Sequence, residues 1–504
     1  MSSLIKSFAA SFTGKIWTAS MSLVLLPYYI KWIGFEAYGL VGVYSALLAL
    51  FTVLDLGLGS SMTREMARIS LNHPPEEFRN LTRTLEVIYW AVAVFIGATL
   101  FLSASYLSEH WIQSQALSRG TVKQTLYLIG VALAFVWPSS LYAGGLIGIQ
   151  RQILLNGIMV TVATLRAIGL LLILAFISPT LHAFFLWQIF VNALQTVLIA
   201  VFLWKSMPHS LVPPKFDKQV IGRIKKYAAG VAGVTVIGVL FSHVDKVILS
   251  RLLTLETFGY YTLATTIAGA LFHVTLPIHS VFFPRFSQLI AINDMQSLKR
   301  IYHSGCQLMS ALVIPSSLFL VLFSREFLFL WTQSPETVNN THVLVKLLVI
   351  GTMFNALLHL PTALQYAFGW TQLAFHLNLL ALLMMIALIC FSTHYFGAIG
   401  AACSWVFVNA LLLISTLQLM HQRIMQKEKV IWVMKDVGSP LAASLIVMAS
   451  GRMLISAQNN SVLSVVQLLL VFLLSLFAAF SVSSQMRHSI RNLFVRWRAS
   501  IALH

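Results

Sequence analysis

The chain has 504 residues, of which 58% are hydrophobic and only 10% are charged, and its mean hydropathy is +0.83. Soluble globular proteins carry about 25% charged residues, so this composition excludes a water-soluble globule. The net charge of +18 does not indicate a nucleic-acid-binding protein, because the cations lie in short connections between apolar segments. The three cysteines lie in apolar segments, so neither a disulfide framework nor a metal site is expected.

Apolar segments recur along the whole chain, and each is long enough to cross a hydrocarbon layer of about 30 Å. We therefore predict an all-α polytopic membrane protein with about fourteen transmembrane helices. The first segment is of full membrane length and no small-residue cleavage site follows it, so we interpret it as a helix rather than a cleavable signal. The predicted spans, in chain order, are 8–30, 39–61, 86–107, 123–146, 154–176, 183–204, 227–250, 259–283, 305–327, 343–366, 373–393, 398–420, 437–456 and 462–482.

Lysine and arginine are distributed unequally between the two sets of connections. With the amino terminus inside, the cytoplasmic connections and tails carry about three times as many of these cations as the opposite side. By the positive-inside rule, both termini are expected in the cytoplasm.

A short internal repeat appears at an offset of 220 residues, where Phe35–Gly39 matches Leu255–Gly259. The same offset places Arg64 near Arg285. Six helices separate the copies, so both halves run in the same direction, and an axis along the membrane normal is expected to relate them. The predicted domains are a lobe of helices 1–6 (1–220), a lobe of helices 7–12 (221–425), and helices 13 and 14 with a basic cytoplasmic tail (426–504).

Polar residues of the first span form a stripe along one face. Ser11, Lys15 and Thr18 lie on it together with two further serines, which points to water or substrate. Lys15 could instead extend to the cytoplasmic interface, but that leaves the other hydroxyls unexplained.

Charges inside other spans are functional candidates, because a charge at the bilayer centre costs roughly 2.5–3.5 kcal/mol. Arg166 lies mid-span among apolar neighbours and needs an anion, which could be Asp55, Asp245 or a substrate phosphate. Asp245 and Lys246 are adjacent and cannot face the same partner, so one can line a cavity while the other is paired, or both can lie at the headgroups. Asp55 either pairs with the arginines that follow it or binds a coupling cation.

Another set of polar side chains lies in predicted spans 8 and 10. Their hydroxyl, amide and aromatic groups suit sugar hydroxyls, although the histidines could equally be packing residues. With the hydroxyls of the first span, the candidate sugar-binding residues are Ser11, Thr18, Asn355, His359, Tyr366 and His273.

No catalytic motif is found. The sequence has no P-loop, no Gly-x-Ser-x-Gly, no metal-spaced Cys/His cluster and no connection long enough for a catalytic domain. We therefore expect a transporter without a cofactor or metal rather than an enzyme, driven by an ion gradient or the membrane potential.

The run Leu54–Arg68 resembles the end of helix 2 in polysaccharide flippases of the Wzx type, within the multidrug/oligosaccharidyl-lipid/polysaccharide exporter superfamily. Asp245–Ser250, followed by Glu256 and Gly259–Tyr261, is similar to the helix 7 to 8 signature of the same group. The resemblance implies a flippase in the bacterial inner membrane that carries an undecaprenyl-pyrophosphate-linked glycan, such as an O-antigen, enterobacterial common antigen or capsule repeat unit. It also implies alternating access through a cavity lined with cations.

The pyrophosphate of such a substrate is multiply anionic, and cations in a low-dielectric cavity bind it strongly. The candidate pyrophosphate-binding residues are Lys15, Arg166, Lys246, Arg64 and Arg285. The resemblance also implies antiport with a proton or sodium ion, for which Asp55 and Asp245 are the intramembrane carboxylates, serving as coupling sites or as structural pairs.

The expected partners are the lipid-linked glycan and membrane lipid, with the polysaccharide polymerase machinery as a candidate. No nucleic-acid partner is expected, and a monomer is sufficient for the two-lobed fold. Three alternatives stay open. A lipid II flippase shares the fold, a multidrug or cation antiporter would need excess intramembrane carboxylates, and a polymerase or ligase would need a larger outer loop.

Overall fold

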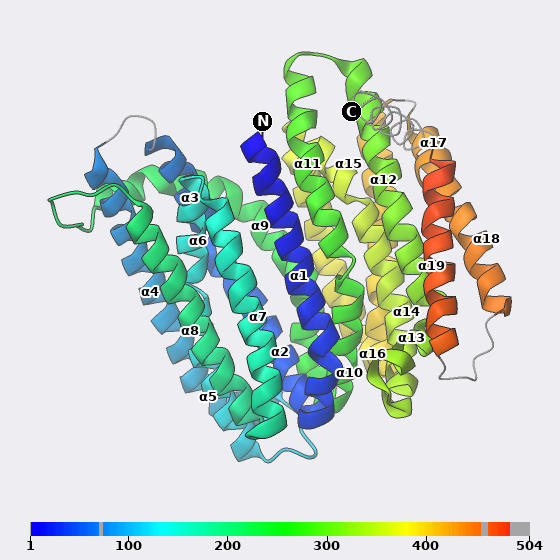
Figure 1. Ribbon diagram of the computed structural model, residues 1–504, viewed down its shortest axis with the longest axis horizontal. Helices are drawn as coiled ribbons and strands as arrows, with labels where there is room; N and C mark the ends of the chain where they lie inside the picture. Colours follow the sequence, from blue (N-terminus) through cyan, green and yellow to red (C-terminus); the bar gives the residue numbers. More distant parts are fainter. Residues whose placement is uncertain (1, 70–73, 427, 455–461, 484–504) are drawn as a thin grey trace, which may run out of the picture. The chain divides into compact units, whose positions relative to one another are not determined.

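The computed structural model describes residues 2–69, 74–426, 428–454 and 462–483, and the regular elements in these ranges are helical (Figure 1). The chain divides into two compact units, Met1–Thr262 and Leu263–His504, here called unit 1 and unit 2. The predicted lobe boundaries after residues 220 and 425 stay predictions. Within the helices, only the backbone is described for residues 2–13, 15, 16, 19, 22, 225–232, 234 and 462.

Unit 1 is built from long helices with short breaks between them. Its elements are α1 (Ser2–Ile33), α2 (Phe35–Thr52), η1 (Val53–Asp55), α3 (Leu58–Ile69), α4 (Pro75–Tyr106), η2 (Leu107–Trp111), α5 (Arg119–Val136), α6 (Ser139–Gly148), α7 (Gln152–Phe176), α8 (Leu181–Ser206), α9 (Lys218–Leu252) and the start of α10 (Leu255–Gly269). In this unit α1 packs along α7, α5 lies between α4 and α8, and α3 packs on α6.

Unit 2 begins within α10. Its other elements are α11 (Phe272–Ala291), α12 (Met295–Leu322), α13 (Ser324–Thr332), α14 (Pro335–Leu357), α15 (His359–Ala367), α16 (Thr371–Arg423), α17 (Lys429–Ile431), η3 (Trp432–Gly438), α18 (Ser439–Leu454) and α19 (Val462–Val482). Helix α12 is its centre, because α11, α14, α18 and α19 all pack against it.

Several helices begin where a capping side chain accepts a hydrogen bond from the first turn. Ser118 caps α5, Thr180 caps α8, Asp294 caps α12 and Ser334 caps α14, with N–H to oxygen distances of 3.1, 3.3, 3.0 and 3.2 Å. Each cap satisfies a backbone N–H that has no partner within its helix, which fixes where the helix starts.

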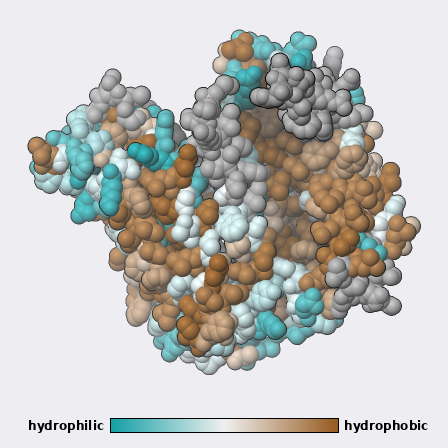
Figure 2. Space-filling view, in the orientation of Figure 1, coloured by the Kyte–Doolittle hydropathy of each residue, from teal (hydrophilic) through white to brown (hydrophobic). Residues whose placement is uncertain are grey.

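Eleven helices in the described part of the chain are long and apolar enough to cross a membrane. Large apolar side chains such as Phe176 and Phe477 are 82% and 71% exposed, which suits lipid rather than water. On the face drawn in Figure 2, hydrophobic residues cover much of the helix flanks and hydrophilic residues gather toward the helix ends. The predicted all-helical, multi-pass membrane architecture is confirmed.

The predicted second span, 39–61, is not one continuous helix. Helix α2 ends at Thr52, and Leu56 and Gly57 have φ values of 44° and 78° before α3 begins at Leu58. Such left-handed backbone suits glycine and interrupts a helix. The prediction of an unbroken helix to residue 61 was therefore wrong, because the break falls just after Asp55.

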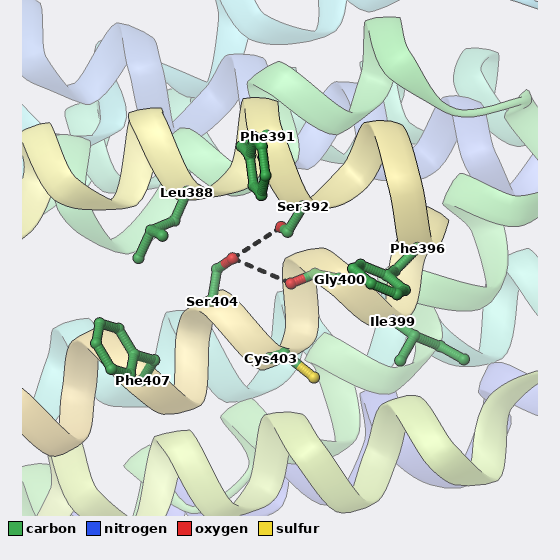
Figure 3. Close-up of a pocket in the computed structure, with 9 residues that line it drawn as sticks. All are labelled: Leu388, Phe391, Ser392, Phe396, Ile399, Gly400, Cys403, Ser404 and Phe407. Carbon is green, nitrogen blue, oxygen red and sulfur yellow. Dashed lines mark hydrogen bonds between the residues drawn. The ribbon is translucent and has the colours of Figure 1, made fainter.

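The longest element, α16, contains a sharp turn at Gly397, where φ is 57° and ψ is −142°. The two arms fold back on each other, and the hydroxyls of Ser392 and Ser404 hydrogen-bond across them at 2.9 Å (Figure 3). The turn falls between predicted spans 373–393 and 398–420, where a break was expected.

Candidate functional site

Arg166 lies on α7 in unit 1, and neutral amides hold its guanidinium. Its Nη2 donates to Asn192 Oδ1 at 2.9 Å and to Gln195 Oε1 at 3.0 Å, both on α8. Asn192, which is fully buried, donates in turn to the hydroxyl of Tyr44 on α2 at 3.2 Å and to the carbonyl of Ala132 on α5 at 3.0 Å. Three neighbouring helices therefore orient the Arg166 side chain.

The charge of Arg166 is not neutralised within the described part of the chain. No ion pair between described residues includes it, and its Nε is buried without a hydrogen-bond partner. Amide oxygens satisfy a guanidinium without cancelling its charge, so the side chain remains able to attract an anion. Neither Asp55 nor Asp245, the two carboxylates considered as its partners, is paired with it.

Asp55 stabilises the break between α2 and α3. Its Oδ2 accepts the Gly59 N–H at 3.2 Å, and its Oδ1 accepts the hydroxyl of the fully buried Tyr89. Arg68, one of the arginines expected to pair with it, instead pairs with Glu65 at 3.0 Å. The structural role expected for Asp55 therefore has a tyrosine and a backbone N–H as partners.

Asp245 lies on α9 and is only 5% exposed. Its Oδ2 accepts the hydroxyl of Tyr261 at 2.8 Å, whereas its Oδ1 is buried without a hydrogen-bond partner. The adjacent Lys246 is partly buried and is in no ion pair between described residues. Because buried acceptors are normally satisfied, the free oxygen of Asp245 is compatible with the predicted ion-coupling role.

The two copies of the internal repeat meet within unit 1. A Cβ added at Gly39 on α2 would lie 2.2 Å from the carbonyl oxygen of Leu255, and one added at Gly259 on α10 would lie 2.4 Å from the carbonyl oxygen of Phe35. The contact is reciprocal, since Phe35 and Gly39 correspond to Leu255 and Gly259 at the offset of 220. Both positions need glycine because the backbones approach too closely for any side chain.

A buried glutamate fastens the segment after η2 to the start of α2. Glu36, 9% exposed, accepts the backbone N–H groups of residues 115–117 at 2.6–2.9 Å. The same segment reaches α10, because the carbonyl of Gln113 accepts the Leu255 N–H at 2.8 Å. The sequence identified Glu36 as part of the repeat but not as the anchor of this segment.

Other predicted pyrophosphate ligands and first-span sugar ligands take varied positions. The side chains of Ser11 and Lys15 lie outside the described residues. Thr18 is exposed and donates to a carbonyl of its own helix at 2.9 Å. Arg64, in unit 1, and Arg285, in unit 2, are both exposed. Their proposed roles stay predictions.

Predicted span 10, 343–366, corresponds to α14 and α15. Helix α14 ends at Leu357 and α15 begins at His359, within one candidate membrane span of Pro335–Ala367. Asn355 donates to Asn409 at 2.8 Å, Tyr366 is partly buried, and His273 is exposed in α11. Their proposed roles in sugar binding stay predictions.

An apolar pocket of about 400 Å³ lies at the turn of α16 (Figure 3). Phe391, Phe396 and Phe407 line it, none of its lining residues is charged, and its two serine hydroxyls bond each other. The pocket therefore lacks the cations that a pyrophosphate requires, and Arg166 stays the candidate for binding an anion.

Residues 4–290 match the family described as "Polysaccharide biosynthesis protein". The chain belongs to this family. It is 23% identical over 414 residues to a Shigella flexneri protein named "Putative O-antigen transporter", covering 82% of this chain and 97% of that protein. It is also 23% identical over 341 residues to the "Uncharacterized membrane protein EpsK" of Bacillus subtilis (strain 168), covering 64% of each. These matches confirm the resemblance to Wzx-type flippases.

Solved structures show the same fold at low sequence identity. A lipid II flippase, MurJ, in an inward closed conformation has a TM-score of 0.68 and 14% identity, covering 96% of this chain and 99% of that one. An inward-facing multidrug resistance MATE family transporter has a TM-score of 0.65 and 14% identity, covering 82% and 94%. These relatives are named as transporters and flippases, in agreement with the expectation of a non-enzyme.

Proposed function

We propose that this chain moves an undecaprenyl-pyrophosphate-linked oligosaccharide from the cytoplasmic to the periplasmic leaflet of the bacterial inner membrane. The observation that carries the proposal is Arg166, a half-buried cation held by Asn192 and Gln195 without a carboxylate. A pyrophosphate supplies the missing negative charge, and charge-assisted hydrogen bonds to it are about twice as strong as neutral ones. The relative named as an O-antigen transporter supports a lipid-linked glycan as substrate.

The architecture we propose has fourteen membrane helices with both termini in the cytoplasm. The 53 residues of α16 would extend roughly 80 Å as one straight helix, far more than a bilayer, which supports two crossings that meet at Gly397. Two six-helix lobes in parallel repeat, followed by a helix pair, are supported by the reciprocal contacts of Gly39 and Gly259.

Transport by alternating access requires a contact that closes one side and later opens. We assign this role to the approach of α2 and α10, held by the glycine contacts and by the bonds of Glu36 to residues 115–117. Opening would also separate packed side chains, since the Phe35 and Tyr260 rings lie 4.1 Å apart between their centroids at this contact.

Asp245, with its unpartnered oxygen, is a candidate for the coupling ion, whether a proton or sodium. We propose that the chain acts as a monomer, and membrane lipid and the polysaccharide polymerase machinery remain proposed partners. A lipid II flippase is the second candidate function, favoured by the fold match to MurJ. Both substrates carry a pyrophosphate, so Arg166 suits either.

Depletion of the chain in its own cells tests the function. We expect an intact lipid-linked oligosaccharide to accumulate on the cytoplasmic side and its sugars to identify the substrate. Accumulation of lipid II would establish the second candidate instead. Unchanged glycan export combined with sensitivity to cationic drugs would refute both and indicate a multidrug exporter.

A further inference from the structure

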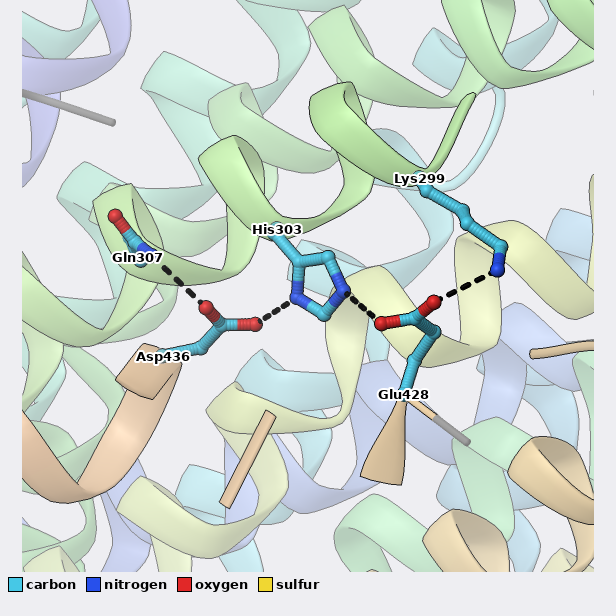
Figure 4. A network of polar contacts seen from close by, with 5 residues as sticks. All are labelled: Lys299, His303, Gln307, Glu428 and Asp436. Atoms are coloured by element: carbon cyan, nitrogen blue, oxygen red, sulfur yellow. Dashed lines mark hydrogen bonds and ion pairs between the residues drawn. The ribbon is translucent and has the colours of Figure 1, made fainter. Parts of the chain in front are cut away.

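A chain of polar contacts lies inside unit 2, where α12 meets the segment that leads into the last two helices (Figure 4). His303 on α12 bonds Asp436 in η3 through Nδ1 and lies 3.3 Å from Glu428 Oε2 through Nε2. Lys299 Nζ donates to Glu428 Oε1 at 2.7 Å, and Gln307 Nε2 donates to Asp436 Oδ1 at 3.0 Å. These five residues are called the His303 cluster below.

The two contacts of the His303 ring require one proton more than the cluster holds when the ring is neutral and both carboxylates are ionised. A neutral imidazole has one N–H donor and one bare nitrogen, so it can donate to only one of two carboxylates. His303 faces a carboxylate oxygen with each ring nitrogen. Either both ring nitrogens of His303 are protonated, or the ring is neutral and one of the two carboxyl groups carries a proton.

Charge balance leads to the same conclusion. With the proton bound, the positive charges of Lys299 and His303 offset the negative charges of Glu428 and Asp436. Without it, one negative charge remains beside Asp436, whose side chain is fully buried. Burying an uncompensated charge is costly, so loss of the proton favours separation of η3 from α12 or entry of water.

Exposure falls steadily along the cluster. The side chains of Lys299, Glu428, His303 and Asp436 are 43%, 13%, 10% and 0% exposed. The hydrogen bond from Lys299 lowers the pKa of Glu428 below its ordinary value, so this carboxylate stays ionised near neutral pH. The exchangeable proton is therefore confined to the inner pair, with a route to water past Lys299.

Other titratable groups surround the pair and could share the proton. They are Lys299, Tyr302 and Cys306 on α12, His421 on α16, Glu428 before α17, and Lys429 on α17. Of these, only Glu428 and Lys299 belong to the hydrogen-bonded chain that reaches His303. Asp436 lies in a π-helix, an irregularity that is frequent at functional sites.

We propose that His303 and Asp436 bind the proton whose uptake and release couple the transmembrane proton gradient to glycan transport. This rests on the proposed function and names its coupling ion. Binding adds one proton to the ring nitrogen of His303, giving an imidazolium between two carboxylates, and release returns that proton to water while η3 moves relative to α12. The site is separate from Asp55 and Asp245, the carboxylates singled out from the sequence, and it takes the coupling role that Asp245 would otherwise have; if Asp245 couples instead, the double variant below responds as the wild type does.

The test uses the full chain in membrane vesicles loaded with lipid-linked glycan, with an imposed pH gradient and the leaflet of the glycan measured. If one proton is exchanged per glycan, the wild-type distribution between leaflets shifts by up to about tenfold per pH unit. A double variant, His303→Gln with Asp436→Asn, should still equilibrate glycan but show no shift. The matched control is Arg452→Gln with Glu326→Gln, which removes another ion pair between α18 and α13 and should respond like the wild type.

Two results would overturn the proposal: a wild-type distribution indifferent to the pH gradient, or a double variant that responds as the wild type does. If the wild type moves no glycan at all, the proposed function itself has failed, and proton binding is then judged alone. In that case purified wild type should take up about one proton more than the double variant between alkaline and neutral pH, and equal uptake would reject the site. If the double variant does not accumulate, the single variant His303→Gln serves in its place, because it removes the ring that binds the proton, and a wild-type response of this variant would equally reject the site.

Discussion

Replacing Gly39 by alanine should force α2 and α10 apart. The new Cβ would lie 2.2 Å from the Leu255 carbonyl oxygen, well inside the 3.0 Å that real Cβ atoms respect. The obstacle is backbone, so the helices must separate by about 1 Å, and such overpacking costs about 1–3 kcal/mol. At Gly222 a Cβ meets nothing within 4 Å, so Gly222→Ala reports the intrinsic effect of alanine in a helix, a gain of roughly 0.5–1 kcal/mol.

The assay is hydrogen exchange of the backbone amides of residues 255–259, which reports opening of the contact. We expect exchange about five to 150 times faster in Gly39→Ala than in the Gly222→Ala control. Gly259→Ala should have a similar effect, and the double variant should cost less than the sum, because one separation relieves both clashes. Exchange equal to the control in both single variants would refute the reciprocal contact.

Three further predictions concern Arg166, Glu36 and Glu428. Arg166→Ala should abolish glycan export at normal membrane levels, while Arg166→Lys should retain part of it. The control Arg223→Ala, which removes a more exposed cation, should change export little. Full activity of Arg166→Ala in the surface-glycan assay would exclude the anion site. Glu36→Gln should speed exchange of the amides of residues 115–117 by about five to 150 times, because a charged acceptor of three N–H groups is lost. The bond to Lys299 lowers the pKa of Glu428, so the stabilisation that the bond provides is present above the ordinary value of 4.5 and is lost as pH falls through the lowered pKa. Protection of the Glu428 backbone amide, measured relative to its intrinsic exchange rate, should therefore fall only in acid.

Membrane helices were predictable from this sequence because their signal is local. Length and apolar composition locate a span, and the turn at Gly397 falls where the sequence shows a break between two apolar segments. The interruption after Thr52 was missed because Leu56 and Gly57 leave the hydropathy of the segment unchanged while reversing the sign of φ. Hydropathy indicates whether a segment lies in lipid or in water, but it does not indicate the conformation of the backbone.

The candidate site was only partly predictable for a related reason. Arg166 stands out because one charge in an apolar span is conspicuous, but its partners Asn192 and Gln195 are neutral and lie on another helix. Their spacing of three residues, which puts both amides on one face of α8, was the available signal. The contact between His303 and Asp436 joins positions 133 residues apart, so no local pattern could indicate it.

We propose that the chain alone moves a pyrophosphate-linked glycan across a bilayer. The most direct measurement places purified chain and lipid-linked oligosaccharide in sealed vesicles and follows, over time, the fraction of glycan open to a membrane-impermeant glycosidase. We expect glycan confined to one leaflet to become accessible on the other in vesicles with wild-type chain, and far more slowly in vesicles with Arg166→Ala. Movement no faster than in protein-free vesicles would contradict it.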